Sequence, residues 1–387
     1  MEIASSYHPL APPTREDTLV TWLRLIRSRR VGATTFFRLI EDHGTAAAAL
    51  EALPDIASAA GVKDYTPFPE DLAKAEIARA RKLGAVALLH DDPSYPLALR
   101  DLADAPPVLW ALGRTDLVQR PMVALVGARN ASSLGLRMAR RLAEGLAASG
   151  YVIVSGLARG IDRAAHIAAM ETGTVAVQAG GIDMPYPVEN TGLAEEIGQK
   201  GLRLSEQPPG LAPQARHFPQ RNRIVSGLAR AVIVVEAASR SGSLITARAA
   251  LDQGREVLAV PGHPFDARAS GCNMLIRDGA VLVRHPEDVL EALGPVPRPD
   301  ADSPAEAPPP RMTAIPETPP AARRAAPPDT AALHARILDR LGPSPLAEDQ
   351  LIRDLGLPAG TVTSELLTLE LDGRIARAPG GLLSRPD

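Results

Sequence analysis

The sequence predicts an α/β protein built around an extended Rossmann-like, doubly wound parallel sheet. Apolar runs of strand length alternate with helical stretches between residues 121 and 292. Most of these runs are continuous rather than alternating, which is typical of strands covered on both faces. The turns between them are rich in glycine. Because sheets of this kind bind ligands at the carboxyl ends of their strands, the loops at those ends are the candidate functional positions.

Two segments precede the strand-rich core: a helical region and a proline-containing lead-in. Residues 16–80 carry apolar side chains at helical spacing, with a glycine turn in VGATTFFRLIEDHGTAAAALEALP. This predicts a small helical domain of the helix-hairpin-helix or sterile-alpha-motif type, whose turn could approach a DNA phosphate, although packing alone is the simpler role. Residues 81–293 form the sheet domain. Prolines in its lead-in, HDDPSYPLALRDLADAPPVLWALG, predict an extended segment and an edge strand.

The C-terminal part divides into a linker and a small domain. Residues 294–329 are rich in proline and alanine, which predicts an extended linker. Residues 330–387 contain three helical stretches followed by RIARAPGGLLSR, the order of a winged helix. Its expected recognition helix, PAGTVTSELLTLELDG, has acidic residues and no Lys or Arg. Because a helix in the major groove normally donates to bases and phosphates, we expect this domain to serve protein contacts.

Composition excludes several classes of protein. The 387-residue chain is 45% hydrophobic and 22% charged with a net charge of −3, as in ordinary globular proteins. Its one cysteine, Cys272, excludes an intrachain disulfide and a cysteine-rich zinc site, and we expect neither a metal nor a cofactor. The N-terminal residues lack a signal-peptide pattern, and no apolar run approaches the ~20 residues that cross a bilayer. We therefore expect a cytoplasmic protein without a membrane partner.

The loop after the first core strand, VGARNASSLG, resembles a dinucleotide fingerprint in which the middle glycine is replaced. A pyrophosphate would meet a side chain there, so a nicotinamide cofactor is disfavoured. Arg129 stands beside the N-terminus of the next helix and suits a phosphate, with a surface salt bridge as the structural alternative. Gly127 just before it is expected to allow a sharp backbone turn.

The loop after the second core strand is SGLARGID. Ser155 and Gly156 expose backbone donors that can form an anion nest, and Arg159 adds charge. Asp162 and His166 lie four residues apart on the following helix. We expect them to make a structural hydrogen bond rather than an acid–base dyad, because no nucleophile or metal-ligand set completes a catalytic site.

The most basic stretch, FPQRNRIVSG, is expected to be a helix that leads into the strand AVIVV. Between Glu206 and Glu236 the chain has four arginines and no acidic residue. Two of them flank Asn222 in the sequence RNR. Since arginines two residues apart cannot share one helical stripe, we expect one to face the cleft and the other to anchor the helix. Arg216 and Phe218 combine charge with a ring, which single-strand binding requires.

Ser241, Gly242 and Ser243 follow that strand and precede another helix. Their hydroxyl and N–H groups can hold a phosphate at the helix N-terminus. Alone they are equally consistent with a plain N-cap. Because the arginines described above belong to the same edge of the sheet, the set as a whole favours an anion-binding surface.

Several motifs between residues 123 and 280 resemble, in order, those of the DNA-processing protein A (DprA/Smf) family: VALVGARNASSLG, VSGLARGIDRAAH, GGIDMPYPVEN, SEQPPG, FPQRNRIVSGLARAVIVVEA, SRSGSLITARAALDQGREVLAVPG and GCNMLIRDGA. The resemblance implies a non-catalytic protein that binds and protects single-stranded DNA entering during natural transformation. It also implies that the protein loads RecA recombinase and acts as a homodimer. In the third loop, other members carry a lysine where this sequence has Val188 and Glu189.

The resemblance places DNA contacts on the arginine after the first strand and on the basic-aromatic run that ends in RNR. With the loops above, the predicted DNA-binding residues are Gly127, Arg129, Ser155, Gly156, Arg159, Arg216, Phe218, Arg221, Asn222, Arg223, Ser241, Gly242 and Ser243. The main alternative is a nucleotide phosphoribohydrolase-like enzyme of related fold, but the PGGxGTxxE pattern with its glutamate is absent. A transcription regulator that uses the winged helix is a third interpretation, and the acidic recognition helix argues against it.

Overall fold

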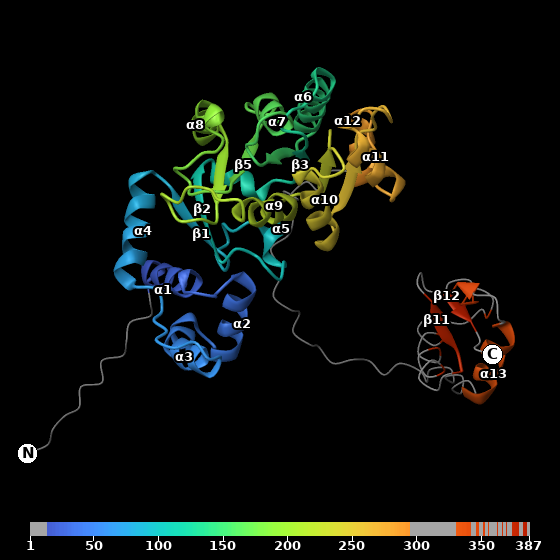
Figure 1. Cartoon of the computed structure of the whole chain (residues 1–387), viewed down its shortest axis with the longest axis horizontal. Coiled ribbons are helices and arrows are strands. Elements are labelled where there is room, and N and C mark those ends of the chain that lie inside the picture. Colours follow the sequence, from blue (N-terminus) through green and yellow to red (C-terminus); the bar gives the residue numbers. More distant parts are fainter. Residues whose placement is uncertain are drawn as a thin grey trace, which may run out of the picture. The chain divides into compact units, whose positions relative to one another are not determined.

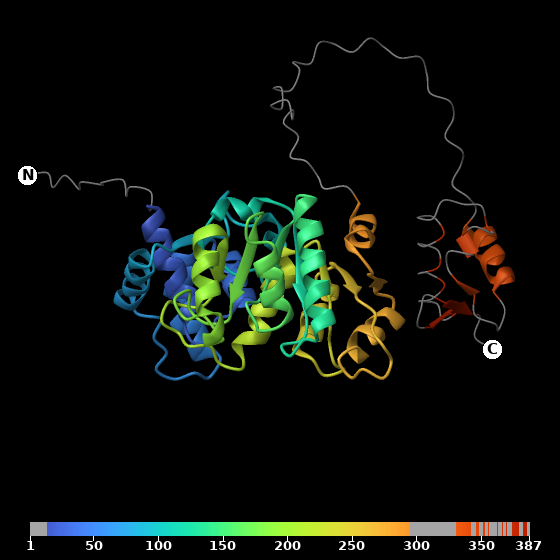
Figure 2. The same cartoon turned by 90° about the horizontal axis from the view of Figure 1, so that it is seen from above.

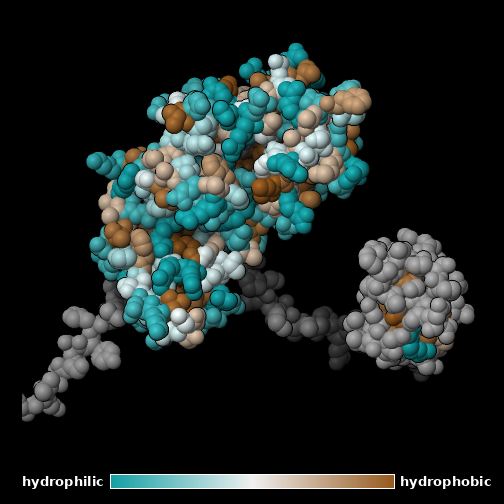
Figure 3. Space-filling view, viewed as in Figure 1, coloured by the Kyte–Doolittle hydropathy of each residue, from teal (hydrophilic) through white to brown (hydrophobic). Residues whose placement is uncertain are grey.

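The computed structural model describes residues 14–294 and, in the C-terminal part, residues 330–341, 346–347, 351–352, 355, 362, 366, 369, 374–378 and 382–384. The chain divides into two compact units, residues 1–301 and 302–387. The first unit holds a nine-stranded sheet with helices on both faces and an N-terminal group of helices (Figure 1). Hydrophilic residues cover most of the face of this unit seen in Figure 3. All but the first residue of the predicted linker lie outside the described residues.

The nine strands are β1 (Val86–Leu89), β2 (Val108–Gly113), β3 (Met122–Val126), β4 (Val152–Ser155), β5 (Thr174–Gln178), β6 (Leu202–Ser205), β7 (Ala231–Val234), β8 (Glu256–Ala259) and β9 (Val281–Leu282). Their order is β1-β2-β6-β5-β4-β3-β7-β8-β9. The strands from β6 to β9 in this order are parallel, whereas β2 pairs antiparallel with both β1 and β6. The predicted doubly wound parallel sheet is confirmed. The expected edge strand is wrong, because β2 lies inside the sheet and β1 forms the edge.

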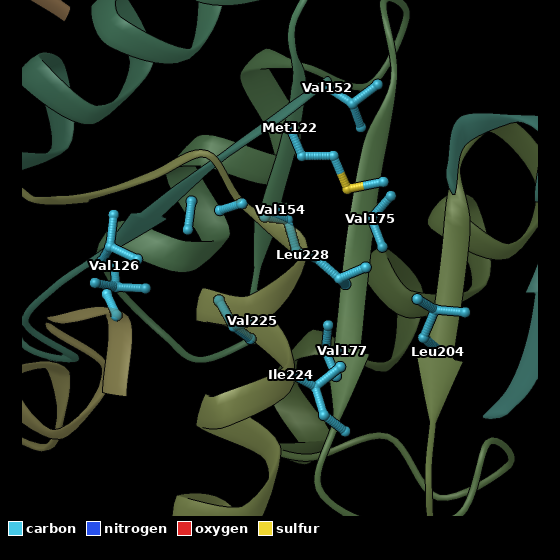
Figure 4. Close-up of a cluster of buried hydrophobic side chains, with 14 of the residues drawn as sticks. Met122, Val126, Val152, Val154, Val175, Val177, Leu204, Ile224, Val225 and Leu228 are labelled. Carbon is cyan, nitrogen blue, oxygen red and sulfur yellow. The ribbon is translucent and has the colours of Figure 1, made fainter. Parts of the chain in front are cut away.

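Alternating side chains of each buried strand enter two separate cores. In β3, Ala124 faces the core covered by α5, α9, α10 and α11, whereas Leu125 faces the core covered by α6, α7 and α12. Figure 4 shows Ile224, Val225 and Leu228 of α9 against the strands. Figure 2 shows α6, α7 and α8 side by side on the opposite face. These helices are α5 (Leu97–Arg100), α6 (Ser133–Ala148), α7 (Ile161–Ala168), α8 (Thr191–Lys200), α9 (His217–Leu228), α10 (Gly242–Asp252), α11 (Ser270–Arg277) and α12 (Pro286–Leu293).

The N-terminal helices pack against the antiparallel end of the sheet. They are α1 (Arg15–Arg27), α2 (Ala33–His43), α3 (Ala46–Ala59) and α4 (Glu70–Lys82). The predicted glycine turn is at Gly44, whose φ of +79° ends α2. Glu76 of α4 is buried and accepts hydrogen bonds from Arg27 at 2.9 Å and from Trp110 of β2 at 2.9 Å. Because a buried carboxylate needs such partners, this network fixes the helical group on the sheet.

The second unit has the elements of a winged helix. Helix α13 (Thr330–Arg340) precedes a three-stranded antiparallel sheet of β10 (Leu346–Ala347), β12 (Leu382–Ser384) and β11 (Ala376–Ala378). The hairpin β11–β12 confirms the predicted wing. Most of the expected recognition helix lies outside the described residues. Its described positions, Val362, Leu366 and Leu369, are helical and buried in the core of this unit.

Candidate nucleic-acid interface

The topological switch point of the sheet lies between β3 and β7. These strands are parallel neighbours, and the chain continues to β4, β5 and β6 on one side and to β8 and β9 on the other. A crevice forms at the carboxyl ends of the strands at such a point. Two cavities open there, of about 650 and 430 Å³, and we call them together the cleft. The loops after β3, β4, β5, β7 and β8 and the first turns of α9 and α10 line it.

The cleft brings together most of the predicted residues. Both cavities are lined by Arg129, Gly156, Phe218 and Arg221. The larger one adds Gly127, Asn222, Ser241, Gly242 and Ser243, and the smaller one adds Arg159. Ser155, Arg216 and Arg223 do not line either cavity.

A cation and two rings lie side by side in the cleft. The guanidinium carbon of Arg129 lies 5.4 Å from the ring centre of Phe218. The Phe218 ring meets the ring of Tyr186 edge to face, with centroids 5.5 Å apart. Arg129 and Tyr186 are both exposed. An arginine over an aromatic face keeps its N–H groups free for an anion, and the exposed ring can stack on a base.

Arg221 forms part of the floor of the cleft. It is buried and donates to the carbonyl oxygens of Gly156 and, at 2.7 Å, of Val177. Burial lowers the pKa of Arg221 to about 10, an effect that Asp162 opposes, so the side chain stays charged at neutral pH. A Cβ on Gly156 would collide with this guanidinium, which requires glycine there. Arg221 therefore ties α9 to the ends of β4 and β5.

Arg223 lies away from the cleft. It donates to a carboxylate oxygen of Glu206 at 2.6 Å and to the carbonyl oxygen of Asp104. The expectation that one arginine of the motif faces the cleft while the other anchors the helix is confirmed. Arg216 is exposed at the start of α9, and its Nε lies 3.3 Å from Nε2 of His217. Burial, followed by the charge of Arg216, lowers the pKa of His217.

The predicted hydrogen bond between Asp162 and His166 is wrong, because each side chain binds the loop before α7. Asp162 accepts from two backbone N–H groups of that loop at 3.1 and 3.3 Å. Nε2 of His166 accepts from the N–H of Leu157 at 3.3 Å, and Nδ1 lies 2.7 Å from the hydroxyl of Thr174. Burial raises the pKa of Asp162 and lowers the pKa of His166 to about 3. A neutral imidazole thus holds the loop from below.

Two predicted roles change once the packing is known. Ser155 is fully buried, with its hydroxyl donating to the carbonyl oxygen of Leu125 at 2.6 Å, and the N–H of the buried Gly156 donates to Asp162 at 3.1 Å, so neither residue exposes a donor as expected. Gly127 does not make the sharp turn. A Cβ on it would collide with the side chain of Ile161, so glycine is needed for close packing.

The N-terminus of α6 already holds an anion from the chain itself. The hydroxyl of Ser132 accepts from the N–H of Gly135 at 2.9 Å. The carboxylate of Glu236, at the end of β7, accepts from the N–H of Ser132 at 2.9 Å and from its hydroxyl. A Cβ on Gly135 would occupy the place of this carboxylate. A pyrophosphate at the usual fingerprint position would have to displace Glu236.

The N-terminus of α10 is open by comparison. The hydroxyl of Ser241 accepts from the N–H of Ser243 at 3.3 Å, and the two hydroxyls lie 2.7 Å apart. Gly242 is exposed, and no atom lies within 4 Å of a Cβ built on it. Free N–H groups at a helix N-terminus attract anions. This turn faces the larger cavity.

The sequence analysis missed Tyr186, Arg240 and Arg268, which also line the cleft. Arg240 stands directly before the Ser-Gly-Ser turn, so its position along the chain was a usable signal. Tyr186 is the single ring in the third loop, but the acidic residues of that loop argue against a phosphate contact there, so the sequence gives no clear signal for it. Arg268 follows β8 at a distance, and only the folded chain shows that it reaches the cleft.

Metal ligands, membrane-spanning helices and a reactive thiol can be assessed within the part of the chain that the structure describes. No group of three or more His, Cys, Asp or Glu side chains there is arranged to hold a metal ion. Among the described helices, none is both long and apolar enough to cross a membrane. Cys272 is buried, and burial raises the pKa of its thiol to about 12.

Family models match three parts of the chain. The model of DNA recombination-mediator protein A matches residues 86–294. The chain belongs to this family, also named DprA or Smf. A DprA-like N-terminal HHH domain matches residues 16–79, and a DprA winged helix domain matches residues 319–381.

Curated relatives and solved structures agree with this membership. DNA processing protein DprA of Streptococcus pneumoniae is 43% identical over 244 residues, which are 62% of this chain and 86% of that protein. Protein Smf of Synechocystis is 38% identical over 311 residues, 76% of this chain and 78% of the relative. The X-ray structure of the S. pneumoniae DprA has a TM-score of 0.61 at 36% identity, covering 70% of this chain and 97% of that one. The structure of DprA from Helicobacter pylori has a TM-score of 0.50 at 31% identity and covers 54% of this chain and 95% of that one.

Proposed function

We propose that this DprA family member binds single-stranded DNA in the cleft and acts as a recombination mediator, not as an enzyme. The observation that carries the proposal is the group formed by Arg129, Phe218 and Tyr186 beside the open N-terminus of α10. It offers donors to phosphates and ring faces to unpaired bases, which is what sequence-tolerant single-strand binding needs. The H. pylori relative, whose structure concerns its single-stranded DNA binding mode, supports it.

The predicted residues divide into two roles in this proposal. Ligand contacts come from groups that line the cleft: the exposed Arg129, Arg159 and Gly242, the partly buried Phe218, Asn222 and Ser241, and the buried Ser243. The loops that carry those contacts are held by the buried Ser155, Gly156 and Arg221 and by the partly buried Gly127 and Arg223. Arg216 is exposed outside the cleft and adds a cation to its approach. Arg159 lies 3.9 Å from Glu189, an exposed pair that a phosphate can replace at little cost.

Fluorescence anisotropy with a labelled strand and its duplex at several salt concentrations tests this proposal. We expect preference for the single strand. The logarithm of the affinity should fall with the logarithm of salt concentration by roughly 0.7 per phosphate contacted. Equal affinity for the duplex would contradict binding in the cleft. AMP hydrolysis is the test of the phosphoribohydrolase alternative, and we expect no release of ribose phosphate.

We also propose, as family membership suggests, that the protein works in the cytoplasm as a homodimer that protects incoming DNA and loads RecA during natural transformation. Leu282 lies in β9, the edge strand of the sheet, and is 40% exposed, which suits a contact between copies. Sedimentation of the full chain should give the mass of a dimer. RecA filaments should form faster on strands coated with single-strand binding protein when this protein is added, and an unchanged rate would refute loading.

A further inference from the structure

We propose a second single-strand subsite that extends the path of the DNA beyond the cleft, and this proposal rests on the proposed function. It is a cavity of about 440 Å³ between the first turns of α6 and the loop of residues 261–269 after β8. Its occupant is the next stretch of the same polynucleotide strand. We call it the α6 subsite. Arg137, Arg141 and His263 are among its lining residues.

The cations of the α6 subsite have no internal partner. Arg137 and Arg141 are exposed on α6, and neither makes a hydrogen bond or ion pair within the described residues. They lie four residues apart on the helix, where two like charges repel each other. The carboxylates that also line this cavity are already engaged: Glu236 by Ser132, and Asp266 by Arg268. The two guanidinium groups are therefore available to an external polyanion, and the nearby Glu236, whose partner Ser132 is neutral, keeps its negative charge.

An exposed ring stands at the same place. Phe265 is 94% exposed, and its ring centroid lies 5.6 Å from that of His263, which lines the α6 subsite. Burial in the protein does not explain an aromatic side chain this exposed. A ring beside arginines is the combination that stacks on unpaired bases while the backbone is neutralised.

The α6 subsite adjoins the cleft. Arg268 lines the larger cavity of the cleft, and Asp266 lines the α6 subsite. The two side chains form an ion pair at 3.0 Å, so the two cavities flank one pair of residues. A strand that leaves the N-terminus of α10 can pass Arg268 and reach Phe265. A single-stranded polyanion with exposed bases fits this continuity better than an acidic peptide, which has no bases to stack.

The test measures affinity of the full chain for oligonucleotides of increasing length. Arg137→Ala with Arg141→Ala should leave the affinity for the shortest bound oligonucleotides unchanged and weaken the affinity for long ones. The salt slope for long oligonucleotides should fall by roughly 1.4, for two phosphates. Phe265→Ala should lower the affinity for long strands by roughly five- to a hundredfold. Arg140→Ala is the matched control against Arg141→Ala, because Arg140 is exposed on the same helix but does not line the cavity.

The outcomes separate the two proposals. If long strands bind the Arg137/Arg141 variant and the Phe265 variant as tightly as the wild type, the α6 subsite is refuted while the cleft stands. The α6 subsite is also refuted if Arg140→Ala weakens binding as much as Arg141→Ala. The loss would then reflect the lower positive charge of α6 and not a contact in the cavity. If Arg129→Ala leaves binding of short oligonucleotides unchanged, the cleft itself is refuted.

Discussion

The helices α6 and α10 both begin with a serine cap at the switch point of the sheet, yet their first turns face different neighbours. At α6 the carboxylate of Glu236 lies on the cap residue Ser132. At α10 the cap Ser241 is followed by an exposed glycine and faces a cavity lined by arginines. Local sequence makes the two N-termini equally attractive to an anion, and one side chain from β7 decides which is available.

The comparison shows how a Rossmann-like sheet can close the usual nucleotide position and still offer an open helix N-terminus to a phosphate. The loop after β3 still resembles a fingerprint loop, but the N-terminus of the helix that follows it, α6, is already occupied by the carboxylate of Glu236. We propose that the anion-binding position is instead the N-terminus of α10, where Arg129 adds charge from the fingerprint loop. Four changes test this difference, given in order of decreasing effect on DNA binding.

Removal of the cation that lies over the Phe218 ring should have the largest effect. Arg129→Ala should lower single-strand affinity roughly ten- to a hundredfold at low salt, because a charge-assisted contact to phosphate is lost. The salt slope should fall by roughly 0.7. Anisotropy titration measures both. Arg248→Ala is the control, since Arg248 is exposed on α10 outside the cleft lining, and an equal loss there would contradict a specific role for Arg129.

A carboxylate placed on α10 should make it resemble α6. Gly242→Asp has room for its side chain and puts a negative charge at the helix N-terminus. Single-strand affinity should fall roughly tenfold, because the carboxylate competes with phosphate. The free energy of unfolding should rise by about 0.3–1 kcal/mol through the helix dipole. The neutral variant Gly242→Asn separates charge from shape; if it binds as weakly as the aspartate variant, charge is not the cause.

Neutralising the internal anion should affect stability more than binding. Glu236→Gln weakens the hydrogen bonds to Ser132 and should lower the free energy of unfolding by about 1–2 kcal/mol. The affinity for short oligonucleotides should change by less than about twofold, since we propose that their phosphates bind at α10 and not at α6. Denaturant unfolding and anisotropy measure the two effects. A large loss of DNA affinity would mean that α6 is part of the main binding site.

The smallest effect on binding is expected from the buried support below the cleft. The pKa of His166 is about 3 in the folded chain against an ordinary value of 6.5, so the unfolded state binds more protons between these pH values. The stability that neutral His166 contributes is complete above pH 6.5 and is lost as the pH falls toward 3. Unfolding of His166→Gln should show a slope in this range that is shallower by up to about 1.4 kcal/mol per pH unit. An unchanged slope would contradict a buried neutral imidazole.

The sequence by itself determined the sheet, its strand runs and the family motifs. A continuous apolar run such as AVIVV is stable only as a strand that is buried on both faces. The structure has strand β7 at this run. The spacing of Arg221 and Arg223 also determined that they point to different sides of α9. These inferences succeeded because periodicity is a local property that tertiary contacts rarely overturn.

Only the tertiary structure decided how the residues at the sheet edge are used. Ser155 and Ser241 both look like exposed donors in sequence, but one is buried beneath the loop and the other opens onto the cleft. The closure of α6 by Glu236 and the approach of Arg268 join residues that are far apart along the chain. Such contacts depend on which strands become neighbours, and no local pattern records that choice.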